Sequence, residues 1–292
     1  MCLLCRVKRT QFSQTYIGVV SAGLLVNNEN AMSIPVALTI AGSDPSGGAG
    51  IQADLKTFHQ RGVYGASVIT LVTVQNTRRV SAVETVKPEI VAAQLDAVLE
   101  DIPPAAAKTG ALGNPDIVRT IAEHARYFRF PLVVDPVMIS KHGQTLMTDQ
   151  ARHILVSLLL PRAFVVTPNL HEAGMMADME VGDPASMREA ALKIAAMGAH
   201  SVLVKGGHLE KDAIDVLYWK GEFIEYSAPH IRTLHTHGTG CTYSACITAE
   251  LAKGYSLPEA VKTAKLFISK AIETNPGLGK GSGPVNHHAQ IS

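Results

Sequence analysis

Short apolar runs rich in β-branched residues alternate with amphipathic stretches along this chain from Val36 onward. The apolar runs have the length and composition of buried strands and lie at 36–41, 67–74, 105–108, 132–135, 164–167 and 201–205. After the first strand, a helix is expected around Ile51, Leu55 and Phe58, and further helices at 88–101, 114–126, 148–159, 170–178 and 184–197. Parallel strands need a crossover connection, usually a helix. The alternation therefore predicts an α/β fold, a mostly parallel sheet with helices on both faces.

The C-terminal part of the chain adds a second pattern. Apolar segments at 214–219 and 223–226 flank Lys220-Gly221-Glu222 and predict a β-hairpin. Two closing helices are expected at about 240–253 and 257–274. We find no internal repeat and no linker, so we expect a single domain at 32–292.

Residues 1–31 precede the first predicted strand and are expected to form a weakly ordered extension. Three basic residues before the apolar run 16–26 give this segment some likeness to a signal peptide, but no small-x-small cleavage pattern follows. The run is also too short to span a bilayer.

The composition excludes several classes of protein. The chain carries 26 Lys and Arg against 25 Asp and Glu, a net charge of +1, which argues against nucleic-acid binding through a broad basic field. A charged fraction of 17% is too low for disorder. The four cysteines are expected to be reduced, and Cys2 and Cys5 lack the second pair that a zinc site needs. We therefore expect a cytoplasmic globular protein with neither a nucleic-acid nor a membrane partner.

Polar and glycine-rich residues cluster directly after the predicted strands, at 42–44, 75–76, 108–110, 135–136, 167–169 and 205–207. Ligands of open parallel sheets bind beyond the carboxyl ends of the strands, so we expect the functional site there.

The loop after the first strand contains G-x-G-x-x-A at 48–53, a pattern found in dinucleotide sites. The loop is longer than the Rossmann turn, and no acidic residue ends the following strand to hold a ribose, so a flexible turn is the other interpretation. Asp54 lies at the edge of the apolar stripe of the following helix. Its carboxylate must be paired, face a ligand or be costly to bury.

The segment 237–242, His-Gly-Thr-Gly-Cys-Thr, stands just before an apolar helix. Glycines allow a close approach to an anion, and the first helical N–H groups stabilise negative charge, although an ordinary helix cap would have the same pattern. In that field Cys241 is expected to have a lowered pKa and thiolate character, whereas Cys246 is expected in the core. No P-loop pattern occurs in the chain.

Asn169 and Glu172 are three residues apart at a helix start, so both side chains can point to one place. Together with Asp135 they suit a magnesium–phosphate network, while a helix cap is the alternative. The scattered histidines are not expected to bind a metal.

Taken together, these segments resemble the hydroxymethylpyrimidine/phosphomethylpyrimidine kinases of thiamin biosynthesis, within the ribokinase-like superfamily. The resemblance covers about residues 36–288 and is carried by 37–44, 47–58, 74–77, 108–110, 134–138, 167–172, 205–208, 236–242 and 283–285. It implies a three-layer α/β/α fold and an ATP- and Mg²⁺-dependent transfer of the γ-phosphoryl group to a pyrimidine hydroxymethyl group and then to the resulting monophosphate. It also implies a homodimer.

The resemblance assigns roles to individual residues. The acceptor pyrimidine is expected near Gly42, Ala49, Asp54, Gln75, Ala111, Val137 and Cys241. The anion hole corresponds to Gly238, Thr239, Gly240 and Cys241, the nucleotide site to Lys205, Gly207 and Asn169, and the metal site to Glu172 and Asp135. Many relatives in the wider superfamily carry an aspartate base where this chain has Cys241, and some members carry methionine at the position of Ala111.

The expected mechanism follows from these assignments. Mg²⁺ and the amides of 238–241 hold the γ-phosphate, and the Cys241 thiolate, or a water beside it, takes the hydroxyl proton. Asp54 and Gln75 orient the acceptor, because an amide offers both a donor and an acceptor to an aminopyrimidine edge. Pyridoxal kinase is the nearest alternative, and a Rossmann oxidoreductase and a non-catalytic pyrimidine-binding regulator remain from other classes.

Overall fold

The computed structural model describes residues 34–138, 143, 146–207 and 212–291. Residues Ile34–Ser292 form one compact unit. The expected N-terminal extension at 1–31, with Cys2 and Cys5, lies outside the described residues.

The centre of the unit is a nine-stranded sheet with the order β3-β2-β1-β4-β5-β6-β7-β8-β9. The six central strands, β2, β1, β4, β5, β6 and β7, run parallel to one another. At one edge β3 pairs antiparallel with β2, and at the other edge β8 pairs antiparallel with both β7 and β9. The strands are β1 Val36–Ser43, β2 Tyr64–Gln75, β3 Val80–Thr85, β4 Ala106–Thr109, β5 Leu132–Val134, β6 Val165–Val166, β7 Val202–Val204, β8 Asp212–Trp219 and β9 Glu222–Pro229. The predicted mostly parallel sheet is confirmed.

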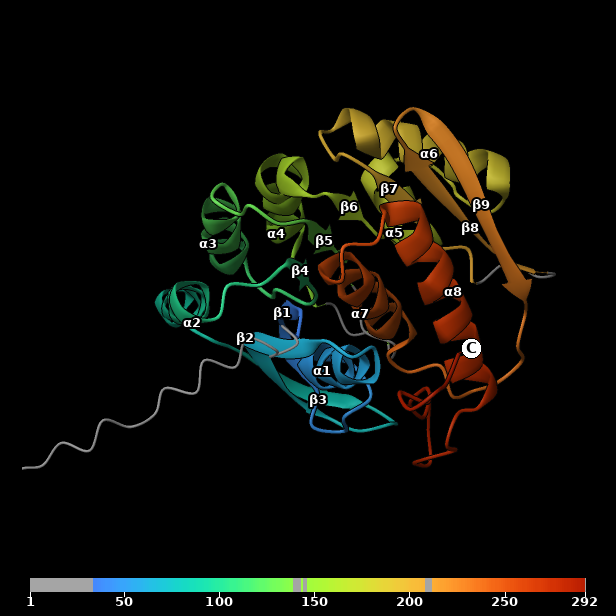
Figure 1. The fold of residues 1–292 in the computed structure, drawn as a ribbon, viewed down its shortest axis with the longest axis horizontal. Coiled ribbons are helices and arrows are strands. Elements are labelled where there is room, and N and C mark those ends of the chain that lie inside the picture. Colours follow the sequence, from blue (N-terminus) through green and yellow to red (C-terminus); the bar gives the residue numbers. More distant parts are fainter. Residues whose placement is uncertain (1–33, 139–142, 144–145, 208–211, 292) are drawn as a thin grey trace, which may run out of the picture. The chain divides into compact units, whose positions relative to one another are not determined.

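Helices cover both faces of the sheet (Figure 1). One layer contains α1 Gly50–Gln60, α7 Thr239–Ala252 and α8 Leu257–Glu273, which share a buried cluster with the inner strands. The other layer contains α2 Pro88–Asp101, α3 Pro115–Ala125, α4 Asp149–Ile154, α5 Leu170–Ala177 and α6 Pro184–Ala196. The three-layer α/β/α architecture is the one expected.

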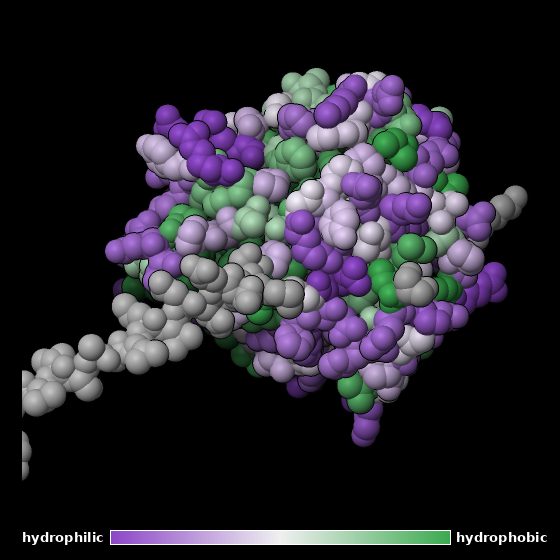
Figure 2. All heavy atoms as spheres, in the orientation of Figure 1, coloured by the Kyte–Doolittle hydropathy of each residue, from purple (hydrophilic) through white to green (hydrophobic). Residues whose placement is uncertain are grey.

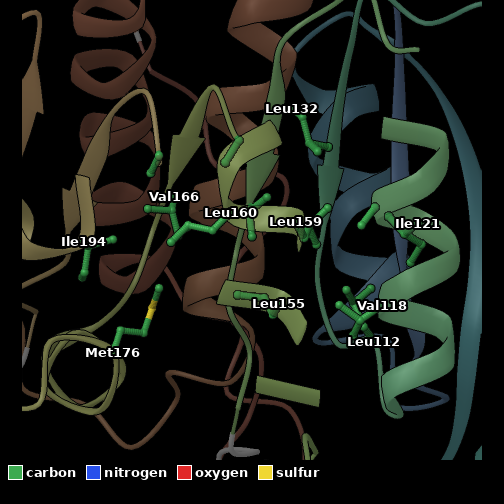
Figure 3. Packing of buried hydrophobic residues seen from close by; sticks show 14 of the residues in the cluster. Leu112, Val118, Ile121, Leu132, Leu155, Leu159, Leu160, Val166, Met176 and Ile194 are labelled. Atoms are coloured by element: carbon green, nitrogen blue, oxygen red, sulfur yellow. The ribbon is translucent and has the colours of Figure 1, made fainter. Parts of the chain in front are cut away.

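The second layer packs through aliphatic side chains, in keeping with the low aromatic content of the chain. Figure 3 shows Val118 and Ile121 of α3, Leu155 and Leu159, and Ile194 of α6 in the same cluster. All five side chains are buried, and burying an aliphatic side chain of this kind contributes about 1.5–3 kcal/mol. This packing fixes the strands from one side while their carboxyl ends stay open for a site.

The structure differs from the sequence-based expectations in two elements. The strand β3 was not predicted, because its residues are largely exposed and it is held by antiparallel pairing with β2. The helix expected at 148–159 ends as α4 at Ile154 and continues as a π-helical segment, Leu155–Leu159, and a 3₁₀ turn, Leu160–Arg162. Pro161 lacks an amide hydrogen, which explains why the regular helix does not continue.

The predicted hairpin is confirmed as β8–β9, and its turn consists of Lys220 and Gly221, both with positive φ (51° and 85°). Two consecutive left-handed residues match the right-handed twist of the flanking strands. On the face seen in Figure 2, hydrophobic residues stand in separate groups among hydrophilic ones. Within the described part of the chain, no helix has the length and apolar character needed to cross a bilayer.

Candidate active site

A cavity of about 920 Å³ opens at the carboxyl ends of the parallel strands. A volume of this size is at the upper end for a small-molecule site. Of the residues that the sequence analysis singled out, all except Asp54 line it: Gly42, Ala49, Gln75, Ala111, Asp135, Val137, Asn169, Glu172, Lys205, Gly207, Gly238, Thr239, Gly240 and Cys241. Segments far apart in the sequence therefore meet in one place.

The anion loop, defined as Gly238–Cys241, leads into the first turn of α7. Gly238 has φ 77°, and a Cβ at this position would lie 1.7 Å from the carbonyl oxygen of Gly48. Only glycine fits here, because the loop rests directly on the backbone of the first glycine-rich loop. The Thr239 amide donates to the Thr236 carbonyl at 3.3 Å, whereas the amides of Gly240 and Cys241 have no carbonyl partner within the helix and can serve an anion in the cavity.

Lys205 and Asp135 bring charge to the same cavity. Nζ of Lys205 donates to Oδ1 of Asp135 at 2.9 Å, and Oγ of Ser244 donates to Oδ2 at 3.1 Å. Burial acts to raise the pKa of Asp135, but the charges of Lys205 and Lys108 outweigh it and hold that pKa below its ordinary value. Both groups are therefore charged at neutral pH.

Asn169 and Glu172 form a capping box at the start of α5. Oδ1 of Asn169 accepts from the Glu172 amide, and Oε2 of Glu172 accepts from the Asn169 amide, each at 2.9 Å. The capping interpretation is thus realised, and the same two residues line the cavity. Burial raises the pKa of Glu172 to about 7.

These carboxylates fit a magnesium ion that is held mainly by phosphate and water. Glu172 is buried without full compensation of its charge, which a nearby cation would supply, and Asp135 adds a second carboxylate. Among the residues that the structure describes, no group of three His, Cys, Asp or Glu side chains is placed to hold a metal by itself.

The expectation of a reactive Cys241 thiolate is wrong. The residue is partly exposed to the cavity, but burial raises the pKa of its thiol to about 11, and the carboxylates of Asp54 and Asp135 act in the same direction. Lys108 acts against the shift without cancelling it. The desolvation of the thiol outweighs the charge of Lys108 and the hydrogen bond from the Gly50 backbone, so Cys241 is a neutral thiol at physiological pH. Cys246 is buried in the core, as expected.

Asp54 also differs from expectation, because its carboxylate is enclosed in the protein and does not line the cavity. Nζ of Lys108 donates to both carboxylate oxygens at 2.8 Å, and the Thr39 hydroxyl donates to Oδ2 at 2.6 Å. Burial acts to lower the pKa of Lys108, but the charge of Asp54 outweighs it and raises that pKa. Of the three possibilities for this carboxylate, pairing is the one realised.

Sequence reasoning missed the connection between the two glycine-rich loops. Asp44 accepts hydrogen bonds from the amides of Ser46, Gly48 and Ala49, and its Oδ2 lies 2.8 Å from Nε2 of His237. The run Ser43–Gly48 is typical of an Asx turn, and this was the available signal. No sequence signal indicated the contact with His237, which lies far along the chain.

The chain's last segment holds the anion loop from the other side. The His237 amide donates to the Gly283 carbonyl at 3.0 Å, and the Val285 amide donates to the His237 carbonyl at 3.3 Å. Val285 is buried. The residue that precedes the anion loop is therefore fixed by the first glycine-rich loop and by the C-terminal tail.

A second missed cluster lies at the far end of the cavity. Oδ2 of Asp215 accepts from the Tyr243 hydroxyl and from Nζ of Lys265, both at 2.8 Å, and Oδ1 accepts from the Gly206 amide at 2.9 Å. All these side chains are buried and line the cavity. They join β8, α7 and α8 to the loop that carries Lys205 and Gly207.

An anion-binding helix start that faces a lysine and two carboxylates across one cavity, on a sheet of this topology, is the arrangement of a ribokinase-like phosphotransferase. The model of the phosphomethylpyrimidine kinase family matches residues 44–286, and the chain belongs to this family. The chain is accordingly a kinase.

Individual relatives agree with the family. A hydroxymethylpyrimidine/phosphomethylpyrimidine kinase of Rhizobium meliloti is 50% identical over 256 residues, which is 86% of this chain and 96% of the relative. The enzyme of the same description from Bacillus subtilis is 45% identical over 261 residues, 88% of this chain and 96% of the relative. An ADP complex of Bacillus subtilis pyridoxal kinase has a TM-score of 0.82 at 40% identity, covering 88% of this chain and 98% of that structure.

Proposed function

We propose that this protein transfers the γ-phosphoryl group of ATP to the hydroxymethyl group of 4-amino-5-hydroxymethyl-2-methylpyrimidine and then to the resulting monophosphate. The observation that carries the proposal is the shared cavity: the anion loop and, with the exception of Asp54, the residues expected at the acceptor line one space. The family and the descriptions of the relatives support the same reaction. The relative crystallised with ADP supports ATP as co-substrate.

The cavity provides for two ligands at its two ends. Gly42, Ala49, Gln75, Ala111 and Val137 surround the acceptor end, and the anion loop lies between the two ends. Lys205, Gly207 and Asn169 belong to the nucleotide end, together with residues of the 229–234 loop and α8. The anion loop between them would receive the group that is transferred. Asp135 and Glu172 would hold Mg²⁺, which supplies charge neutralisation to the phosphates when it is bound.

The chain's residues contribute position and charge rather than covalent chemistry. The loop amides and the Lys205 ammonium stabilise charge on the equatorial oxygens, and Gln75 orients the acceptor through its amide. A neutral Cys241 cannot take the hydroxyl proton, so water beside it is the preferred acceptor of the two expected. Asp54 acts from inside the protein by holding Lys108 charged beneath the site.

A coupled ADP-release assay with the hydroxymethylpyrimidine, its monophosphate and pyridoxal tests this proposal. We expect turnover with both pyrimidines and much slower turnover with pyridoxal. If pyridoxal is the better substrate, the alternative assignment as a pyridoxal kinase is correct. ADP release without any of the three acceptors would contradict both.

We also propose that the enzyme is a cytoplasmic homodimer with a single catalytic domain at 32–292. The family resemblance supports the dimer, and the matched family region supports the single domain. Sedimentation equilibrium gives the oligomeric state, and a monomer mass at micromolar concentration would contradict the dimer.

A further inference from the structure

The side-chain amide of Gln75 lies between two polar groups of the acceptor end. Its Nε2 is 3.2 Å from Nε2 of His237, and its Oε1 is 3.2 Å from Oγ1 of Thr73. All three residues line the cavity. Turning the amide by 180° exchanges its oxygen and nitrogen without changing its outline, so the hydrogen-bonding partners decide which end faces which group.

On one side, His237 presents an N–H group. Its Nε2 lies 2.8 Å from the carboxylate of Asp44, which also accepts from the amides of Ser46, Gly48 and Ala49. Burial acts to raise the pKa of Asp44, but the hydrogen bonds from His237 and Ser46 outweigh it and lower that pKa. An ionised carboxylate requires a donor, so Nε2 carries hydrogen whether the ring is neutral or cationic. A nitrogen that carries hydrogen has no lone pair to accept from an NH₂ group, whereas an amide oxygen can share the N–H with Asp44, so the end of the Gln75 amide on this side must be the oxygen.

On the other side, Thr73 presents lone pairs. Its hydroxyl has a single hydrogen, and Oγ1 lies 3.0 Å from the carbonyl oxygen of Ser43, which can only accept. Once that hydrogen is donated to Ser43, the Thr73 oxygen can only accept from Gln75. The end of the amide on this side must therefore be the NH₂ group. The two contacts are independent, and both require the same turned amide.

We propose that Thr73 and the Asp44–His237 pair are positioning residues that set substrate specificity by fixing the Gln75 amide, with its oxygen toward His237 and its NH₂ group toward Thr73. The proposal rests on the function proposed above. His237 directly precedes the anion loop, so the oxygen end of the amide is the end nearer the transferred group. The site then takes a heterocycle that carries a hydrogen-bond donor beside its reacting hydroxymethyl group and an acceptor one atom further along the ring.

A 4-amino-5-hydroxymethylpyrimidine has this order: the amino group is next to the hydroxymethyl group, and a ring nitrogen with a lone pair follows. The 4-oxo analogue in its lactam form has the reverse order, a carbonyl and then an N–H. In this site its carbonyl would face the oxygen of Gln75, and its N–H would face the NH₂ group of Gln75. Sites that hydrogen-bond a polar substrate group reject a mismatched analogue strongly, so we expect a preference of about 100-fold or more in kcat/KM.

The experiment compares kcat/KM for the 4-amino and 4-oxo compounds by ADP release in the parent enzyme and three variants. Thr73→Val removes the accepting oxygen, one of the two contacts that fix the amide, so the amide is less strongly held and the preference for the amino compound should fall at least 10-fold. Thr73→Ser keeps the oxygen and should keep the preference. Thr248→Val is the matched control, because it removes a buried hydroxyl that donates to the Ser244 carbonyl away from the cavity.

The ratio between two substrates is insensitive to a general loss of folded enzyme, which separates this role from a structural one. If the parent phosphorylates both compounds equally well, or if Thr73→Val keeps the parent's ratio, the amide is not fixed in this way. If the parent phosphorylates neither compound, the proposed function itself fails.

Discussion

At the scale of single residues, burial rather than chain-local electrostatics sets the ionisation of the Cys241 thiol. Because burial raises its pKa to about 11, alkylation of Cys241 should be slow at pH 7 and should accelerate steadily up to about pH 11. Cys241→Ser should keep most of the turnover, since neither side chain is ionised at neutral pH. Thiol alkylation followed by peptide mass spectrometry gives the pH profile. A reactive plateau already reached at pH 8 would restore the thiolate interpretation.

Gly238 offers a test of the packed glycine loops. Gly238→Ala should abolish measurable kcat/KM, because its Cβ would meet the Gly48 carbonyl at 1.7 Å and would displace the anion loop. Gly254→Ala is the matched control: Gly254 also has positive φ (88°), but a Cβ there meets nothing within 4 Å. It should cost about 1–2 kcal/mol of unfolding free energy and leave activity intact. Urea denaturation and the ADP-release assay measure the two effects, and equal activity losses would contradict the contact argument.

Glu172 should make stability depend on pH. Its folded pKa of about 7 exceeds the ordinary value of 4.5, so the folded state binds the proton more tightly. The contribution of Glu172 to the free energy of unfolding should therefore fall as pH rises from about 4.5 to about 7, by an amount on the order of 3 kcal/mol. Burial lowers the pKa of His287 to about 4, which gives a contribution of opposite slope between about pH 4 and 6.5, so the difference between the parent and a Glu172 variant isolates the glutamate. In urea titrations, Glu172→Gln should remove the Glu172 contribution, so that the parent loses stability relative to the variant as the pH rises from about 4.5 to about 7.

The control for Glu172 is Glu259, the exposed glutamate of the capping box of α8. Hydrogen bonds from Ser256 lower its pKa, so its stabilising contribution is present above the unfolded pKa and is lost as the pH falls through the folded one. Glu259→Gln should thus change the pH dependence below about pH 4.5 and leave the slope up to pH 7 in place. If the parent and Glu172→Gln depend on pH in the same way between about pH 4.5 and 7, Glu172 does not make this contribution.

At the scale of elements, the buried pair Asp54–Lys108 joins α1 to β4, and Thr39 adds β1. Lys108→Met should cost about 3–5 kcal/mol of unfolding free energy, because it leaves a buried carboxylate without its cationic partner. Combining it with Asp54→Asn should recover a large part of this loss. Chemical denaturation of the single and double variants gives the coupling between the two sites, and additive losses would show that the pair is not coupled.

The predictability of these elements follows from where their stability arises. The buried parallel strands and their helices could be predicted, because each carries its own apolar pattern. The edge strand β3 could not, since its exposed residues form a strand only through pairing with β2. The glycine loops of the site could also be predicted, because each carries its own local sequence pattern. The partners Lys108 and His237 were not, because they meet Asp54 and Asp44 through the tertiary fold alone. A lysine in the buried run 106–109 was the one signal that a carboxylate must lie opposite.

At the scale of the whole molecule, residues 1–31 are expected to be dispensable for catalysis. The first core strand begins at Val36, and the family match begins at residue 44. A chain starting at Met32 should keep kcat/KM within about twofold of the full chain and keep its unfolding midpoint, because tolerance to truncation follows from burial and hydrogen bonding. The same assay and denaturation series test this. An insoluble or inactive product would show that the extension belongs to the fold.

The contacts of His237 have a consequence for how the enzyme is made. His237, the residue before the anion loop, is held by Gly283 and Val285, and one face of β4 and β5 is covered by α7, which follows both strands in the chain. A ribosome that has delivered β4 and β5 therefore exposes apolar strand surface that has no cover until α7 emerges, the condition in which nascent chains attract chaperones. Catalytic competence therefore needs the segment that contains Gly283 and Val285, so translation products that stop before it should be inactive rather than slow.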